Sequence, residues 1–273
     1  MSFKKRTTTA AFLLVLLFLL FQYASRLVFF LALEGIILAA LVEFYSLARK
    51  RKLYPQRILG VIMALVLSLS FLFPDKFPFM LALFACFLIQ TFYYLFAFNT
   101  VEKLHLFPSS IAVTMFGALY VSFTLGYFYP LRIEWGSYTV YFLFGVIFVG
   151  DTGAYLVGRA IGRHKMAPLA SPNKTWEGAV AGIVTACLAG VMGRMLLVPH
   201  ISLGKAVLCA ALVHAVAQAS DPLESLFKRA VGVKDSSNML PGHGGFLDRV
   251  DSLILAAPFF YYFINFFWKT SGR

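Results

Sequence analysis

Charged side chains are scarce in this chain of 273 residues. Asp, Glu, Lys and Arg make up 13% of it, whereas an ordinary soluble domain has about 25%. Hydrophobic residues make up 60%, and phenylalanine alone occurs 30 times. This composition excludes an ordinary soluble protein. It predicts an integral membrane protein with the lipid bilayer as a partner.

Several familiar sites are also missing. The three cysteines, Cys86, Cys187 and Cys209, lie singly in apolar runs. Their separation argues against a disulfide framework or a zinc site and favours small core residues. The chain has no Walker A pattern, no G-x-S-x-G and no H-E-x-x-H. A P-loop ATPase, a serine hydrolase of that kind and a zincin are therefore disfavoured.

Apolar runs long enough to cross a bilayer, about 20 residues each, recur along the chain. They lie at residues 9–25, 27–47, 57–74, 77–98, 109–130, 137–157, 178–198, 203–224 and 250–268. The first resembles a signal peptide but lacks a small-residue cleavage site. The sequence predicts an all-α polytopic fold of about nine transmembrane helices in one membrane domain. About five belong to an N-terminal region, 1–136, and the rest to a catalytic region, 137–273, with two cytoplasmic loops.

Lysine and arginine are distributed unevenly between the two sides that these helices define. If the N-terminus is cytoplasmic, the outer side holds six of the 24 basic residues: Arg26, Lys76, Arg132, Lys205, Lys269 and Arg273. Because basic residues concentrate in cytoplasmic loops, the pattern predicts an N-terminus inside. It also explains the net charge of +12 without nucleic acid as a partner. The loops at about 158–177 and 225–249 then face the cytoplasm.

Acidic residues in the second half of the chain gather on the same side. Beyond Glu134 they are Asp151, Glu177, Asp221, Glu224, Asp235, Asp248 and Asp251. All of them fall at or near predicted cytoplasmic helix ends. Carboxylates avoid hydrocarbon, but this does not explain why the outer loops of the same half hold none.

The predicted helix 203–224 carries a polar stripe. His214, Gln218, Asp221 and Ser225 recur at spacings that place them on one helical face, and Glu224 neighbours Asp221. Polar groups on a membrane helix face a protein interior or a wet cavity. The stripe predicts a functional site, with helix–helix hydrogen bonding as the alternative, most openly for His214.

Asp248 and Asp251 open the last predicted helix. Acids at that position favour the helix dipole, so simple capping is one interpretation. Magnesium takes oxygen ligands, usually one or two carboxylates plus substrate phosphates. The other interpretation is therefore that Asp221 and Asp248 share Mg²⁺, with a second cation left open.

Glycines and cations surround these acids. Gly244 and Gly245, beside His243, would let backbone N–H groups approach a phosphate. Trp176 either stacks on a base or anchors the chain at the membrane interface. The cationic candidates for holding phosphates are Arg159, Arg163, Lys165, Lys174, Lys228, Arg229, Lys234 and Arg249. For Lys228 and Arg229, ordinary cytoplasmic loop charge is the alternative.

The stretch from Ser225 to Asp251 resembles the C-terminal signature of the phosphatidate cytidylyltransferase family, also called CDP-diacylglycerol synthases. The matching positions are Ser225, Phe227, Lys228, Arg229, Lys234, Asp235, Ser237, Leu240, Pro241, His243, Gly244, Gly245, Phe246, Asp248, Arg249, Val250 and Asp251. The segments S-P-N-K-T-W-E-G at 171–178 and D-T-G-A-Y from Asp151 are also similar to the family. One departure is Ser220-Asp221-Pro222 where the family usually shows Gly-Asp; it keeps the carboxylate.

The resemblance implies an often dimeric, all-helical, magnesium-dependent enzyme that makes CDP-diacylglycerol and pyrophosphate from CTP and phosphatidic acid. It implies metal ligation by Asp221 and Asp248. With the residues above, it predicts catalytic roles for Asp221, Asp248, Lys228, Arg229 and His243. The predicted substrate-binding residues are Asp151, Ser171, Asn173, Lys174, Thr175, Trp176, Glu224, Lys234, Gly244, Gly245, Arg249 and Asp251. The short N-terminal tail favours a bacterial inner-membrane enzyme with a cytoplasmic active site.

Two other functions are compatible with the sequence. One is a cytidylyltransferase or CTP-dependent kinase acting on another lipid phosphate or on a polyisoprenol. The other is an ion-coupled transporter. Transporter sites usually lie near the bilayer midplane between repeats, whereas these acids gather at one surface and no internal repeat is visible.

Overall fold

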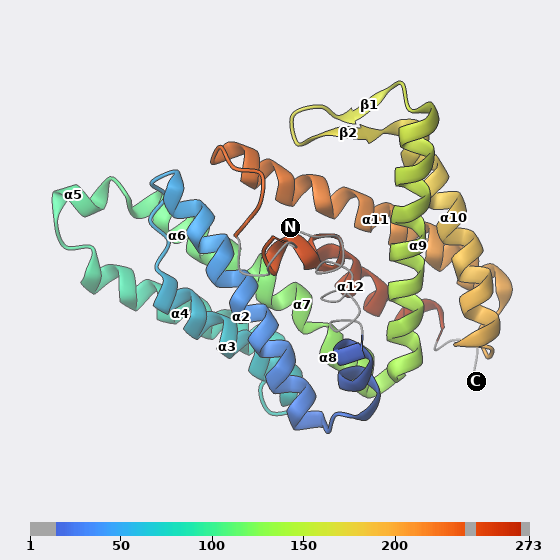
Figure 1. Cartoon of the computed structure of the whole chain (residues 1–273). Coiled ribbons are helices and arrows are strands. Elements are labelled where there is room, and N and C mark those ends of the chain that lie inside the picture. Colours follow the sequence, from blue (N-terminus) through green and yellow to red (C-terminus); the bar gives the residue numbers. More distant parts are fainter. Residues whose placement is uncertain (1–14, 238–243, 269–273) are drawn as a thin grey trace. The chain divides into compact units, whose positions relative to one another are not determined.

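A computed structural model describes residues 15–237 and 244–268, mostly as helices (Figure 1). The chain divides into two compact units. Unit 1 comprises Met1–Tyr129 and Ala230–Val250, and unit 2 comprises Pro130–Arg229 and Asp251–Arg273. The boundary that the sequence predicts, between residues 136 and 137, stays a prediction.

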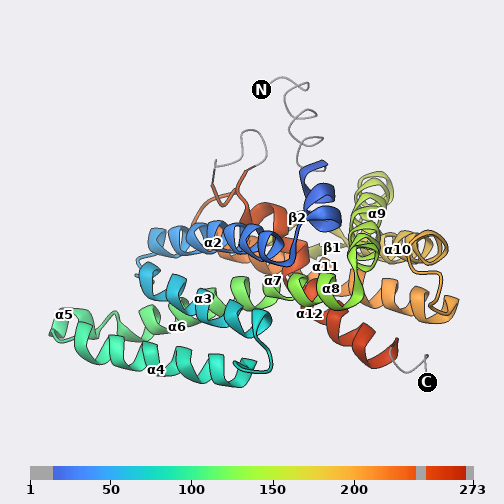
Figure 2. The same cartoon turned by 90° about the horizontal axis from the view of Figure 1, so that it is seen from below.

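Unit 1 is built from helices that follow the predicted apolar runs. Residues 15–23 are helical. Next come α2 (Arg26–Lys50), α3 (Arg57–Leu72), α4 (Phe79–Ala97) and the short α5 (Val101–Leu104). A last continuous helical run holds α6 (Phe107–Gly117), the π-helix η1 (Ala118–Phe123), α7 (Thr124–Gly126) and α8 (Phe128–Trp135), which crosses into unit 2. Figure 2 shows α3 lying beside α4.

The interior of unit 1 is apolar with a few satisfied polar groups. Leu59, Met63 and Leu67 of α3 pack against Cys86 and Tyr94 of α4. In α2, the fully buried Tyr45 donates a hydrogen bond of 2.6 Å to the carbonyl of Thr114 in α6. Because a buried hydroxyl without a partner is costly, this bond fixes how α2 packs on α6.

Unit 2 contains the remaining long helices. These are α9 (Ser137–Ile161), α10 (Trp176–Leu196), α11 (Leu203–Ala230) and α12 (Leu247–Phe267), whose first turn belongs to unit 1. Helices α9 and α10 lie side by side (Figures 1 and 2). Their backbones approach closely at Gly153, where a Cβ would overlap Thr185 of α10.

The helices account for the predicted membrane character. Within the described residues, seven are long and apolar enough to cross a bilayer, with Phe107–Trp135 counted as one. Helix α3 is apolar but has 16 residues. The predicted first span, 9–25, extends into residues outside the described part. A mainly helical integral membrane protein is therefore confirmed.

Two boundaries differ from the sequence prediction. The predicted loop at about 158–177 is shorter, because α9 extends to Ile161, and it contains an antiparallel hairpin, β1 (Lys165–Ala167) and β2 (Ser171–Thr175). The predicted loop 225–249 also begins too early, since α11 continues through Pro222 to Ala230. A proline removes one backbone hydrogen bond, and tertiary contacts of the following turns outweigh that loss.

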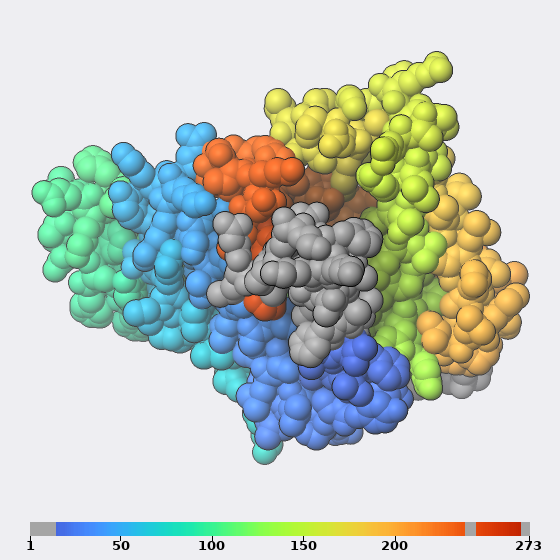
Figure 3. Space-filling model, in the orientation of Figure 1, coloured from blue at the N-terminus to red at the C-terminus, as the bar shows by residue number. Residues whose placement is uncertain are grey.

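The hairpin stands out on the surface of unit 2 (Figure 3). Leu169, between the strands, is 84% exposed. Glu177 in the first turn of α10 holds the base of the hairpin: its carboxylate accepts bonds from the N–H groups of Arg163 and His164 and lies 2.6 Å from His164 Nδ1. The hairpin is thereby fixed to the start of α10.

Candidate active site

An ion pair joins the hairpin to α11 within unit 2. Lys174 Nζ of β2 lies 2.7 Å from Asp221 Oδ2, and both side chains are about one-third exposed or less. Ser225 Oγ, one turn further along α11, donates to Asp221 Oδ1 at 3.3 Å. The predicted polar stripe is thus confirmed at these two positions. Lys174 and Asp221, predicted from separate motifs, are brought into contact.

A second ion pair lies about one turn after Asp221 on α11. Lys228 Nζ is 2.5 Å from Glu224 Oε2, at the i,i+4 spacing. Glu224 is fully buried and Lys228 is 7% exposed. Lys228 is therefore not an ordinary solvated loop charge, because burying an ammonium group requires a partner. The prolonged helix produces this arrangement, since a loop at 225–229 would not hold the i,i+4 geometry.

Two further carboxylates interact with these pairs. Asp151 of α9 is within electrostatic range of Lys174 and Asp221. Asp251 of α12 is within range of Asp221, Glu224 and Lys228. We call this group the carboxylate–lysine cluster. It consists of Asp151, Lys174, Asp221, Glu224, Lys228 and Asp251, and its carboxylates outnumber its lysines.

The departure from the family pattern at Ser220 has a structural explanation. Ser220 is fully buried, and its hydroxyl donates to the backbone carbonyl of Asp251 in α12. The same oxygen accepts the N–H of Leu255 at 3.4 Å. A glycine lacks this hydroxyl, so Ser220 adds a connection between α11 and α12 beside Asp221.

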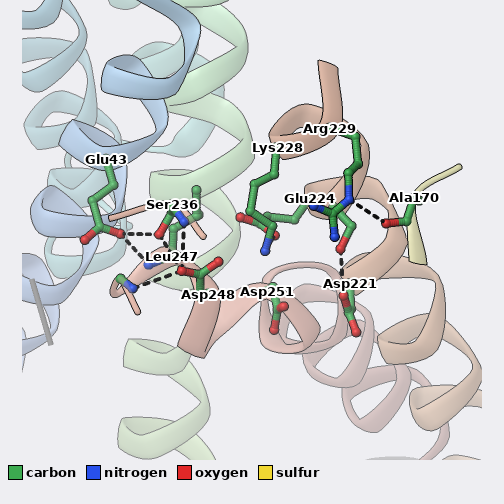
Figure 4. Close-up of polar contacts among 12 residues, drawn as sticks. Glu43, Ala170, Asp221, Glu224, Lys228, Arg229, Ser236, Leu247, Asp248 and Asp251 are labelled. Atoms are coloured by element: carbon green, nitrogen blue, oxygen red, sulfur yellow. Dashed lines mark hydrogen bonds and ion pairs between the residues drawn. The ribbon is translucent and has the colours of Figure 1, made fainter. Parts of the chain in front are cut away.

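The other predicted residues of unit 2 lie on the hairpin, at the start of α10 and at the end of α11. Arg229 Nε donates to the carbonyl of Ala170, between the strands of the hairpin, at 3.4 Å (Figure 4). Thr175 is buried and caps α10 by accepting the N–H of Gly178 at 3.2 Å. Ser171 is half-buried, Asn173 is exposed, and Trp176 is 58% exposed at the start of α10. An exposed indole at this position suits either base stacking or interfacial anchoring.

His214 and Gln218 serve helix packing. Gln218 Nε2 donates to the carbonyl of Ala179 in α10 at 3.1 Å and lies 2.8 Å from His214 Nε2. His214 is fully buried, and a Cβ at Gly150 or Gly182 would press against its ring. Helix–helix hydrogen bonding, one of the interpretations of the stripe, therefore describes Gln218. His214 bonds to Gln218 within α11 and packs against α9 and α10.

A different network lies in unit 1, around Asp248 at the start of α12. Asp248 Oδ2 accepts three hydrogen bonds, from Ser236 N at 2.9 Å, Ser236 Oγ at 2.8 Å and Gly245 N at 2.9 Å (Figure 4). Asp248 thus organises the preceding loop. The N–H of Gly245, predicted to face a phosphate, is donated to this carboxylate in the structure.

Glu43 of α2 is the residue that sequence reasoning missed. It is 4% exposed, and its carboxylate accepts bonds from Ser236, Ser237, Phe246 and Leu247. A buried acid near the end of a membrane helix is itself a signal. Its partners lie about 200 positions later in the chain, as the separations of 193 to 204 residues show, so spacing did not reveal them.

Four predicted residues of the stretch before and at the start of α12 complete the set. His243 lies outside the described residues, so its catalytic role stays a prediction. Lys234 and Arg249 are exposed in unit 1, and Gly244 is half-buried there. Gly244 has φ +78°, a conformation that favours glycine.

The carboxylate oxygens of both networks are ligands suited to a hard cation such as magnesium. Asp221 already has the Lys174 ammonium group in contact with Oδ2, so the position accepts a cation. In the described part of the chain, no group of three or more His, Cys, Asp or Glu side chains is placed to hold a metal. One or two carboxylates, such as Asp221 and Asp248, fit magnesium that takes its other ligands from substrate phosphates and water.

Comparisons with known proteins identify the family. A model described as the cytidylyltransferase family matches residues 4–267. A Staphylococcus saprophyticus protein named phosphatidate cytidylyltransferase is 32% identical over 265 residues, which cover 93% of this chain and 96% of that protein. One of the same name from Bacillus subtilis is 34% identical over 240 residues, or 83% and 86% of the two chains.

A shorter match is more similar. A Haemophilus influenzae phosphatidate cytidylyltransferase is 41% identical over 135 residues, which cover 48% of this chain and 47% of that protein. The chain thus spans about half the length of this relative. The family model and the nearly full-length match from S. saprophyticus decide the assignment. This chain belongs to the cytidylyltransferase family.

Proposed function

We propose that this protein transfers CMP from CTP to phosphatidic acid, giving CDP-diacylglycerol and pyrophosphate for phospholipid biosynthesis. The observation that carries the proposal is the carboxylate–lysine cluster at the end of a membrane helix in a cytidylyltransferase-family chain. Relatives matched over most of their length are named phosphatidate cytidylyltransferase. An amphiphilic lipid phosphate needs polar groups of this kind beside an apolar surface.

The reaction requires positioning more than strong proton transfer. A phosphate oxygen of phosphatidate forms a bond to the α-phosphorus of CTP, the bond from that phosphorus to the bridging oxygen breaks, and pyrophosphate leaves with the electron pair. The attacking phosphate is already largely ionised near neutral pH, so no strong base is needed. Alignment and charge neutralisation then supply most of the acceleration. Lys174, Lys228 and Arg229 are the groups that we assign to the phosphates.

The carboxylates of the cluster favour a bound cation. The ionised carboxylates of the cluster would repel a free triphosphate, and a cation bound beside them would offset that repulsion. We propose that Asp221 and Asp248 bind Mg²⁺, which would neutralise charge on the triphosphate and on the departing pyrophosphate. When CTP binds, Lys174 exchanges its contact with Asp221 for one with phosphate.

Activity of the purified protein tests this function. With labelled CTP, magnesium and phosphatidic acid in detergent micelles, we expect CDP-diacylglycerol and an equal amount of pyrophosphate, and we expect chelation of magnesium to stop both. Other lipid phosphates and polyisoprenols serve as comparison substrates. If one of these gave a CDP-lipid or a phosphorylated product while phosphatidic acid gave none, the assignment of the substrate would be wrong.

We also propose nine transmembrane helices with the N-terminus and the hairpin on the cytoplasmic side of a bacterial inner membrane. The support is the uneven distribution of basic residues. A cysteine at Leu169, the exposed hairpin position, is expected to resist a membrane-impermeant maleimide in intact spheroplasts and to react after lysis. A cysteine at Lys76, predicted outside and exposed, is expected to react before lysis.

Both labelling variants are made in a Cys187→Ala background, because Cys86 and Cys209 are buried. Labelling at position 169 in intact spheroplasts would place the hairpin on the outer side. That result would overturn the orientation while leaving the proposed reaction untouched.

A further inference from the structure

We propose that Glu43 is a positioning residue for the active site: it holds Ser236 and Ser237 of the signature loop against the start of α12 and thereby orients Asp248. The signature loop is defined as the described residues 231–237 and 244–246, between α11 and α12. This inference rests on the proposed function for its catalytic consequence. Its structural part is testable without substrate.

The first argument is the number of hydrogen bonds that Glu43 accepts from the loop. Ser237 Oγ donates to Oε1 at 2.6 Å, and Ser236 Oγ lies 3.0 Å from Oε2. The N–H of Phe246 donates to Oε1 at 3.1 Å, and that of Leu247 to Oε2 at 2.9 Å. One carboxylate therefore binds both the Ser236–Ser237 part of the loop and the start of α12.

Because Glu43 is buried, its hydrogen bonds strongly constrain the position of the loop. Glu43 is 4% exposed and Ser236 is 5% exposed. An ionised carboxylate removed from water is tolerated only when donors surround it. Two of its donors are N–H groups at the N-terminus of α12, where a negative charge is favoured. Displacing the loop would leave a buried charge unsatisfied.

A shared hydroxyl connects Glu43 to the proposed metal ligand. Ser236 Oγ lies 3.0 Å from Glu43 Oε2 and 2.8 Å from Asp248 Oδ2 (Figure 4). A serine hydroxyl has one proton, so it donates to one of these carboxylates at a time. Ser236 N–H also donates to Asp248. The orientation of Asp248 is therefore set through a residue that Glu43 holds.

Partners of this kind have measurable effects on metal sites. Residues that orient a metal ligand from outside the coordination shell typically contribute about 10–100-fold to metal affinity or activity. Glu43 is in that position relative to Asp248. It is a positioning residue and not a catalytic one, because its described contacts are with the protein's own loop.

Glu43→Gln tests the proposal, with Glu34→Gln as the matched control. Both residues are buried glutamates of α2, and Glu34 interacts with Ser68 of α3. Glutamine keeps the size of the side chain but replaces one acceptor oxygen with a donor that faces other donors. We expect Glu43→Gln to lower kcat about 10–100-fold and to raise the magnesium concentration for half-maximal activity, with the KM for phosphatidate unchanged.

A second readout needs no activity. In the unliganded protein in detergent, hydrogen exchange at the amides of Phe246 and Leu247 is expected to accelerate in Glu43→Gln and to stay at the wild-type rate in Glu34→Gln. If wild-type protein made no CDP-lipid from phosphatidate, the proposed function would fail. This exchange comparison would still decide whether Glu43 holds the loop.

The proposal is overturned if Glu43→Gln keeps kcat and magnesium dependence within twofold of wild type, or if exchange at both amides is unchanged. If Glu43→Gln does not fold, Ser237→Ala replaces it, because that change removes the 2.6 Å bond to Oε1 and leaves Glu43 in place. Ser237→Ala is expected to lower kcat and to accelerate exchange at the two amides, each by a smaller factor than Glu43→Gln. If neither kcat nor exchange changed, the proposal would be contradicted.

Discussion

Asp221→Asn is expected to lower kcat on the order of 1,000-fold, the upper range for losing one group that stabilises charge in a transition state. Asparagine is nearly isosteric, so Ser225 and α11 keep their packing. The loss of charge removes the partner of Lys174, which lies 2.7 Å away, and the proposed magnesium ligand. Steady-state turnover with CTP and phosphatidate, alongside a melting curve in detergent, measures the effect.

The control for Asp221→Asn is Glu134→Gln, which removes one negative charge from unit 2 at a site bonded to Tyr261. It is expected to keep turnover within a few-fold of wild type. A folded Asp221→Asn protein with robust activity would remove Asp221 from the metal site. Asp248→Asn is a less direct test, because Asp248 Oδ2 also accepts three bonds that order the loop.

Gly245→Ala is expected to reduce turnover on the order of 100-fold, the upper end for a disturbed partner of a metal ligand. A Cβ at this position would overlap Ser236 Oγ and Glu43 Oε2. Overpacking of a filled interior typically costs about 1–3 kcal/mol. Here it also separates the groups that orient Asp248. Thermal unfolding and steady-state kinetics on the purified variant measure the two consequences.

Gly35→Ala is the control for Gly245→Ala. Gly35 lies in α2, and a Cβ there would meet nothing within 4 Å. Alanine in a helix interior is favoured over glycine by about 1 kcal/mol, so this variant is expected to be neutral or slightly more stable. Equal activity of Gly245→Ala and wild type would show that the loop adjusts to the added methyl group.

Helix spacing in the sequence predicted the polar stripe of α11, and the structure confirms contacts between Gln218 and His214 and between Ser225 and Asp221. Local periodicity is sufficient for such a prediction, because residues four apart on a helix are always neighbours. Where α11 ends was not predictable in the same way. Pro222 and the charged residues after it are typical of a helix end, yet the buried pair of Glu224 and Lys228 extends the helix.

The hairpin illustrates a second limit. Residues 165–175 have no alternating apolar pattern, and a two-stranded hairpin has little stability of its own. Its structure depends on Glu177, Trp176 N–H donated to His164 O, and the ion pair of Lys174 with Asp221. These contacts exist only once α9, α10 and α11 have packed.

The sequence by itself determined that this is a mainly helical membrane protein of the cytidylyltransferase family, because composition, apolar run length and a long motif are local properties of the chain. The tertiary structure alone decided which groups meet. It placed Lys174 against Asp221, buried Lys228 against Glu224, and set Glu43 against Ser236, 193 residues away. Long-range pairing follows from packing of whole helices, and no spacing in the sequence encodes it.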